Sequence, residues 1–135
     1  MEFVINYWAV LVAALVYMFV GMFWYGFGFG KMWIKMMGFT EESMKSMPLT
    51  PMQAMAGGLV TAFIMAFVLA KLTIIYGAIG VAGAWGLAFM IWLGFFFTET
   101  AGAWLWEGKS FKLFAFNAAH RLVALFLMAL VLVLW

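Results

Sequence analysis

The stretch LFAFNAAHRLVALFLMALVLVLW, residues 113–135, decides the fold of this chain. It is long enough to cross a bilayer, because a spanning helix needs about 20 predominantly apolar residues. Asn117, His120 and Arg121 interrupt it, and an ionisable group inside a bilayer is costly unless it is paired or hydrated. The stretch therefore predicts a membrane-spanning helix that carries a polar site within its length.

Three further apolar stretches of similar length lie at residues 7–29, 52–76 and 79–105. The chain of 135 residues is 70% hydrophobic and 9% charged, so lipid must surround most of its surface. We expect an all-α membrane protein in which one domain, residues 1–135, forms an antiparallel bundle of four transmembrane helices. No segments alternate apolar and polar residues, which excludes a membrane β-barrel. The first stretch lacks a basic N-terminal region, so we do not expect a cleaved signal peptide.

Lysines in the loops predict the orientation of the chain. Five lie in the first and third loops (Lys31, Lys35, Lys45, Lys109 and Lys112), whereas Lys71 is the one lysine expected at the opposite side. Positively charged loops stay in the cytoplasm, so both termini are predicted outside the cytoplasmic (inner) membrane of a prokaryote. The inverted orientation stays open because the charge bias is weak.

The first loop is expected to hold a short amphipathic helix. Thr40 is its predicted N-cap, with Glu41 and Glu42 in the first turn, and Pro51 is a suitable start for the following helix. Methionines supply the apolar side of this loop: Met32, Met36, Met37, Met44 and Met47. They are interpreted as a deformable face against lipid or a neighbouring protein, because Met is scattered throughout the chain. The alternative is a thioether surface for copper(I).

Small residues at helical spacing predict close helix packing, within one chain or between copies. Gly26 and Gly30 form one such pair, and Ala82 and Gly86 form another. The chain has no cysteine and a single histidine, which excludes disulfides, thiolate metal sites and a multi-histidine metal or haem site. We expect no metal and no cofactor. The net charge of +2 does not indicate nucleic-acid binding.

Polar side chains from all four spans are predicted to share one layer in the inner half of the membrane. The helical rise places Glu99 about 12 Å from Glu107, and His120 about 12 Å from Lys112. The layer consists of Tyr25, Thr61, Thr98, Glu99, Thr100, Asn117, His120 and Arg121.

Arg121 stays protonated and needs a counter-charge in a dry site. Glu99 is the one acid at that depth, so a Glu99–Arg121 contact is predicted, with His120 beside it. In the alternative, Arg121 reaches toward the headgroups and Glu99 hydrogen-bonds His120. The layer is either a path or binding site for a proton, ion or small solute, or a polar contact that only fixes helix packing. No Ser or Cys nucleophile accompanies His120, so we expect no catalytic residue and no enzyme activity.

Several segments of the chain resemble a known family. They are INYWAVLVAA (5–14), WYGFGFGKMW (24–33), GFTEE (38–42), FTET (97–100), WEGKS (106–110) and NAAH (117–120). Together they resemble the domain of unknown function family number 1761, small four-helix integral membrane proteins of prokaryotes. Gly28 stands where a proline is expected after the Trp-Tyr-Gly motif. The resemblance implies a four-helix integral membrane fold and implies no particular activity.

Two classes of function stay open. The first is a small binding or permeation protein, which would be a homo-oligomer because four short helices rarely enclose a path alone. The second is an accessory or structural subunit that packs its aromatic and methionine-rich surface against a larger membrane complex, with lipid, quinone or pigment contacts. Purification in mild detergent distinguishes them, because a pure homo-oligomer favours the first and a stoichiometric foreign chain favours the second.

Overall fold

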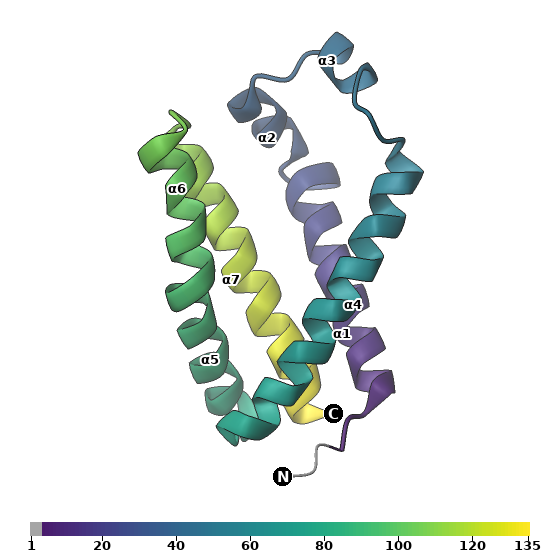
Figure 1. Cartoon of the computed structure of the whole chain (residues 1–135), viewed down its shortest axis with the longest axis vertical. Helices are drawn as coiled ribbons and strands as arrows, with labels where there is room; N and C mark the ends of the chain where they lie inside the picture. Colours follow the sequence, from purple (N-terminus) through teal and green to yellow (C-terminus); the bar gives the residue numbers. More distant parts are fainter. Residues whose placement is uncertain (1–3) are drawn as a thin grey trace.

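The computed structural model describes residues 4–135, which form helices and no strand (Figure 1). The elements in chain order are α1 (Tyr7–Met22), the π-helical segment η1 (Phe23–Phe27), α2 (Gly30–Met37), α3 (Glu41–Lys45), α4 (Pro51–Tyr76), α5 (Gly80–Ile91), the π-helical segment η2 (Trp92–Phe97), α6 (Thr98–Trp106) and α7 (Phe111–Leu134). Four stretches are long and apolar enough to cross a membrane: Tyr7–Phe27, Pro51–Tyr76, Gly80–Trp106 and Phe111–Leu134. The predicted all-α, four-span membrane fold is confirmed.

Short polar side chains cap the first turns of several helices. Asn6 accepts hydrogen bonds from the backbone N–H groups of Trp8 and Ala9, and the Ser110 hydroxyl accepts one from Leu113. Thr40 begins α3 with a capping box, which confirms the predicted N-cap. Each cap satisfies a backbone donor that the first turn of a helix leaves free.

The spans run antiparallel and differ in how they pack. Figure 1 shows α2, α3 and the turn between α6 and α7 at one end of the molecule, which we call the loop end, and the turn between α4 and α5 at the other. Helix α7 lies centrally and packs against α1 and α5, whereas α4 packs mainly against α1 and touches α5 little. The site described below lies between the first span and α7.

Alanines form most of the helix contacts in the half of the bundle away from the loop end. Ala62, Ala66 and Ala70 recur at every fourth position of α4 and are buried, and Ala84 and Ala88 do the same in α5. A small side chain lets helix backbones approach closely where no hydrophobic force drives association. Larger buried residues, such as Leu87 and Met128, fill the space between these contacts.

Toward the loop end α4 and α6 move apart, and Figure 1 shows these two helices diverging on either side of α7 and α1. Residues 51–57 of α4 are all exposed, and α6 has no buried residue. We call the surface formed by residues 51–57 of α4 and by α6 the open side. The four spans therefore enclose a packed core over only part of their length.

Two π-helical segments interrupt the first and third spans. In η1, Gly26 has φ −125° and ψ −108°, which lies outside the helical region and marks a kink. The Gly28 N–H then donates to the Phe23 carbonyl at 2.8 Å, and a Cβ atom on Gly28 would lie 2.5 Å from that oxygen. A proline could not supply this donor. This contact explains why glycine fits the position at which the family resemblance leads one to expect proline.

Candidate binding site

Four polar side chains that the sequence places in one layer do come together, between η1 and α7. We call Tyr25, Asn117, His120 and Arg121 the polar cluster. The Tyr25 hydroxyl donates to Asn117 Oδ1 at 2.6 Å, and Arg121 Nη1 donates to the backbone carbonyl of Asn117 at 3.2 Å. Because Asn117 lies one turn nearer the loop end than Arg121, the guanidinium reaches toward that end of the molecule.

His120 is the most deeply buried member of the polar cluster. Its side chain is 4% exposed, and neither Nδ1 nor Nε2 has a hydrogen-bond partner. Three aromatic rings surround it, with centroid distances of 5.9 Å to Tyr17, 6.0 Å to Trp24 and 4.9 Å to Tyr25. A neutral imidazole offers one donor and one acceptor, and leaving a buried polar atom unsatisfied costs about 1–3 kcal/mol. The imidazole is therefore a candidate ligand-binding group.

Tryptophan side chains hold the same part of α7 from two directions. Trp24 Nε1 in η1 donates to the Phe116 carbonyl at 3.1 Å, and Trp92 Nε1 in η2 donates to the Ala118 carbonyl at 2.8 Å. Both π-helical segments thus face one turn of α7, next to the polar cluster. Such segments occur frequently at functional sites.

A groove of about 300 Å³ lies between the first span and α4, beside His120. Its lining consists of Tyr17, Met18, Gly21, Met22, Tyr25, Gly26, Ala54 and Met55. Two of these residues, Tyr17 and Tyr25, also pack their rings against His120. Gly21 lines the groove, and a Cβ atom on it would lie 3.9 Å from His120 Nε2, so this glycine lies next to both the groove and that nitrogen.

The four remaining members of the predicted layer lie apart from the polar cluster. Thr61, Thr98 and Thr100 each donate to backbone carbonyls of their own helices, at distances from 2.7 to 3.3 Å. Thr61, Thr98 and Glu99 are exposed, and Thr100 is half-buried. The structure therefore brings together members of the first and fourth spans, while a depth shared by all four spans stays a prediction.

The predicted contact of Glu99 with Arg121 within one chain is wrong, since residues 4–135 contain no salt bridge. The alternative hydrogen bond from Glu99 to His120 is wrong as well, because both imidazole nitrogens lack a partner. The physical reason is rotation about the helix axis. The extra residue in η2 turns α6 relative to a regular helix, and aromatic contacts of Phe97 and Trp104 with Phe114 place another face of α6 against α7.

In each small-residue pair that was predicted to pack helices, one member is packed within the chain and the other is exposed. Gly30 is buried against the Tyr25 backbone across the kink, and a Cβ on Gly86 would lie 2.9 Å from the Tyr76 hydroxyl oxygen. Gly26 and Ala82 are exposed. Packing between copies through these two positions stays a prediction.

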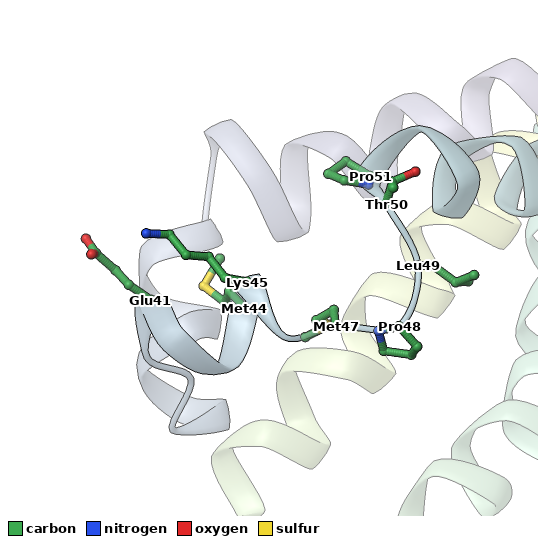
Figure 2. A pocket seen from close by; sticks show the side chains of 8 residues that line it. All are labelled: Glu41, Met44, Lys45, Met47, Pro48, Leu49, Thr50 and Pro51. Atoms are coloured by element: carbon green, nitrogen blue, oxygen red, sulfur yellow. The ribbon is translucent and has the colours of Figure 1, made fainter.

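A second cavity, of about 520 Å³, lies in the first loop and the start of α4 (Figure 2). Figure 2 shows Glu41 and Lys45 pointing outward from α3, with Met44 between them. Every residue that lines it is exposed. It includes Met44 and Met47 of the methionine set, but it has no buried polar group that would orient a ligand. We therefore place the candidate site at His120.

Sequence reasoning missed the two tryptophan contacts, the role of Gly21 and the ring of Tyr17. Trp92 carried a usable signal, because tryptophan in a span usually lies at a membrane interface and Trp92 lies far from either end of its stretch. An indole N–H at that depth needs an acceptor inside the protein. Nothing in the sequence indicates the contacts that Gly21 and Tyr17 make with His120.

The fold and the polar cluster define the chain as a multi-pass α-helical membrane protein with a buried histidine between its first and fourth spans. The chain belongs to the family described as protein of unknown function (DUF1761), whose model matches residues 8–133. This match confirms the resemblance carried by the sequence segments. Neither the curated proteins nor the solved structures contain a match.

Proposed function

We propose that the protein binds a small ligand with an apolar body and a hydrogen-bonding head. The head binds at His120, and the body occupies the groove between the first span and α4. The observation that carries this proposal is the buried imidazole with two unpartnered nitrogens. Ionisable residues inside membrane spans commonly serve ligand or ion sites.

The shape of the site supports a ligand drawn from the membrane. The groove volume of about 300 Å³ is at the small end of the range for ligand pockets. Its walls carry Met18, Met22 and Met55, whose flexible thioether side chains adapt to apolar ligands. The two tyrosine rings that line the groove also contact His120, so an occupant of the groove would lie next to the imidazole.

Binding is favoured over permeation by the size of the cavity at Arg121. That cavity has a volume of about 10 Å³ and is lined by Tyr17, Met65, Phe96, Arg121 and Leu125. A space of this size holds roughly one water molecule at most. A proton or ion path through this level would need a rearrangement of the surrounding side chains.

Substitution of Gly21 tests the proposal directly. The protein is purified in mild detergent from its native membrane, and native mass spectrometry measures any small mass that stays bound. Gly21→Ala is the matched control, because its Cβ would meet His120 at an ordinary contact distance of 3.9 Å. Gly21→Leu extends further and should abolish the bound mass, as should His120→Phe.

Ala54→Trp narrows the groove from the opposite wall at an exposed position and should act like Gly21→Leu without touching the helix contact. Equal retention of the bound mass by Gly21→Leu, Ala54→Trp and the wild type would refute a ligand in this groove. Helix content and particle size of each variant, measured in parallel, separate loss of binding from loss of fold.

A second candidate function is that of an accessory subunit in a larger membrane complex. A wholly apolar groove of about 480 Å³ supports it, lined by Val12, Leu15, Val16, Phe19, Val20 and Phe23 of the first span and by Val123 and Leu127 of α7. Such a surface fits a partner helix or an acyl chain. If this function holds, a foreign chain co-purifies with the wild type and is lost on Val123→Trp, which fills the groove, while Gly21→Leu retains it.

A further inference from the structure

Glu99 is the polar group that the single chain leaves without an explanation. It lies within the third span, about 12 Å from Glu107 by helical rise, and its side chain is exposed. An ionised carboxylate that faces lipid at this depth is strongly disfavoured, so such residues nearly always face a protein interior, a partner charge or water. Something must therefore cover Glu99 in the membrane.

Glu99 lies on the open side of the bundle. It lies one turn nearer the loop end than Phe96, and Phe96 lines the small cavity beside Arg121 together with Met65 of α4. The side chain of Arg121 reaches from that cavity toward the loop end, where it bonds the Asn117 carbonyl. The chain thus places an exposed acid about one helical turn from a cavity that a half-buried base lines, without joining the two.

Arg121 needs a counter-charge as much as Glu99 does. Its guanidinium cannot lose its proton and has five donors, of which one is bonded to the Asn117 carbonyl. No carboxylate lies within ion-pair distance of it in the part of the chain that the structure describes. The charges of Glu99 and Arg121 are complementary, which makes a second copy of this chain the partner that satisfies both.

We propose that a second copy covers the open side in a two-fold symmetric dimer, in which Glu99 of each copy pairs with Arg121 of the other. A two-fold interface is self-complementary, so one contact of an acid with a base is made twice. The partner copy completes the polar cluster by neutralising Arg121. This proposal does not rest on a ligand at His120, because the pair of charges involves Glu99 and Arg121, neither of which lines the groove.

Charge reversal in two separately tagged chains tests the pairing. Homodimers of Glu99→Arg bring arginines together, and homodimers of Arg121→Glu bring glutamates together, so each variant alone should lose the dimer. In a mixed dimer, the arginine introduced by Glu99→Arg in one copy meets the glutamate introduced by Arg121→Glu in the other, and the second contact is the native pair. Co-expression should therefore restore dimer recovery by about tenfold or more over either variant alone, the factor expected from one close charge pair.

Three controls make each outcome decisive. Glu107→Arg makes the same charge change at the exposed end of α6 and should leave the dimer intact. The double variant Glu99→Arg, Arg121→Glu in one chain should also dimerise. If reversal prevents insertion, Glu99→Gln keeps the shape of the side chain and should yield a folded monomer.

Three results would overturn the proposal. The first is a wild-type protein that is monomeric in lipid nanodiscs. The second is dimer size unchanged by Glu99→Arg, Arg121→Glu and Glu99→Gln. The third is rescue in the single-chain double variant without rescue in the mixture, which would place the pair within one chain. Loss of the ligand on Gly21→Leu with the dimer retained would leave this proposal standing, so the two proposals fail separately.

Discussion

Replacing Tyr25 by phenylalanine removes one oxygen atom and, with it, the hydrogen bond that joins the first span to α7. The Tyr25 hydroxyl donates to Asn117 Oδ1 at 2.6 Å, and both residues are half-buried. Hydrogen bonds between membrane helices contribute about 0.6 kcal/mol on average and up to about 1.7 kcal/mol. A short bond whose loss leaves the amide oxygen unpartnered should be in the upper part of that range, so Tyr25→Phe should destabilise the protein by about 1–1.7 kcal/mol.

Unfolding in mixed micelles of mild detergent and dodecyl sulfate, followed by circular dichroism, measures this free energy. Tyr7→Phe is the matched control, because Tyr7 is exposed and its hydroxyl has no hydrogen-bond partner within the described residues. Tyr25→Phe, Asn117→Ala and the double variant form a cycle that isolates the coupling between the two side chains. A coupling below about 0.3 kcal/mol, the size of ordinary additivity error, would refute the hydrogen bond as a link between these helices.

Two further predictions concern orientation and packing. The chain has no native cysteine, so Ser43→Cys should resist an impermeant thiol reagent in intact cells while a cysteine appended after Trp135 reacts, and labelling of position 43 from outside would reverse the predicted orientation. Gly86→Leu should lower the free energy of unfolding by about 1–3 kcal/mol more than Gly102→Leu, because a Cβ on Gly86 would lie 2.9 Å from the Tyr76 hydroxyl oxygen whereas one on Gly102 meets nothing within 4 Å. Equal effects of the two substitutions in the same unfolding assay would contradict that contact.

The sequence predicted the spans and the level of the polar cluster, because both depend only on hydropathy and helical rise. It did not predict how the helices are rotated about their axes. A soluble helix reveals its rotation through a polar face, whereas the apolar side chains here cover all sides of each span. The π-helical segments then change the rotation further, so that Tyr25 reaches α7 and Glu99 does not.

The buried alanines of α4 could have been predicted from the sequence as helix-packing residues. Prediction of close packing relied on the pairs Gly26/Gly30 and Ala82/Gly86, but Ala62, Ala66 and Ala70 are the buried small residues of α4. Their spacing of four is visible in the sequence, and alanine serves helix packing in membranes as glycine does. By contrast, nothing in the sequence indicates that Gly21 lies next to both a groove and His120, because that relation joins residues of two spans.

The proposed function depends on His120 as the group that binds a ligand. Because the chain has a single histidine, the imidazole can be observed by NMR without assigning other resonances. Selective ¹⁵N labelling of the imidazole gives one resonance for each ring nitrogen, because the chain contains one histidine. The spectrum is recorded on delipidated protein in nanodiscs before and after addition of an extract of the native membrane. We predict that the extract shifts a ring-nitrogen resonance of the wild type and of Gly21→Ala but not of Gly21→Leu. Resonances that stay unchanged in all three proteins would contradict a ligand at His120.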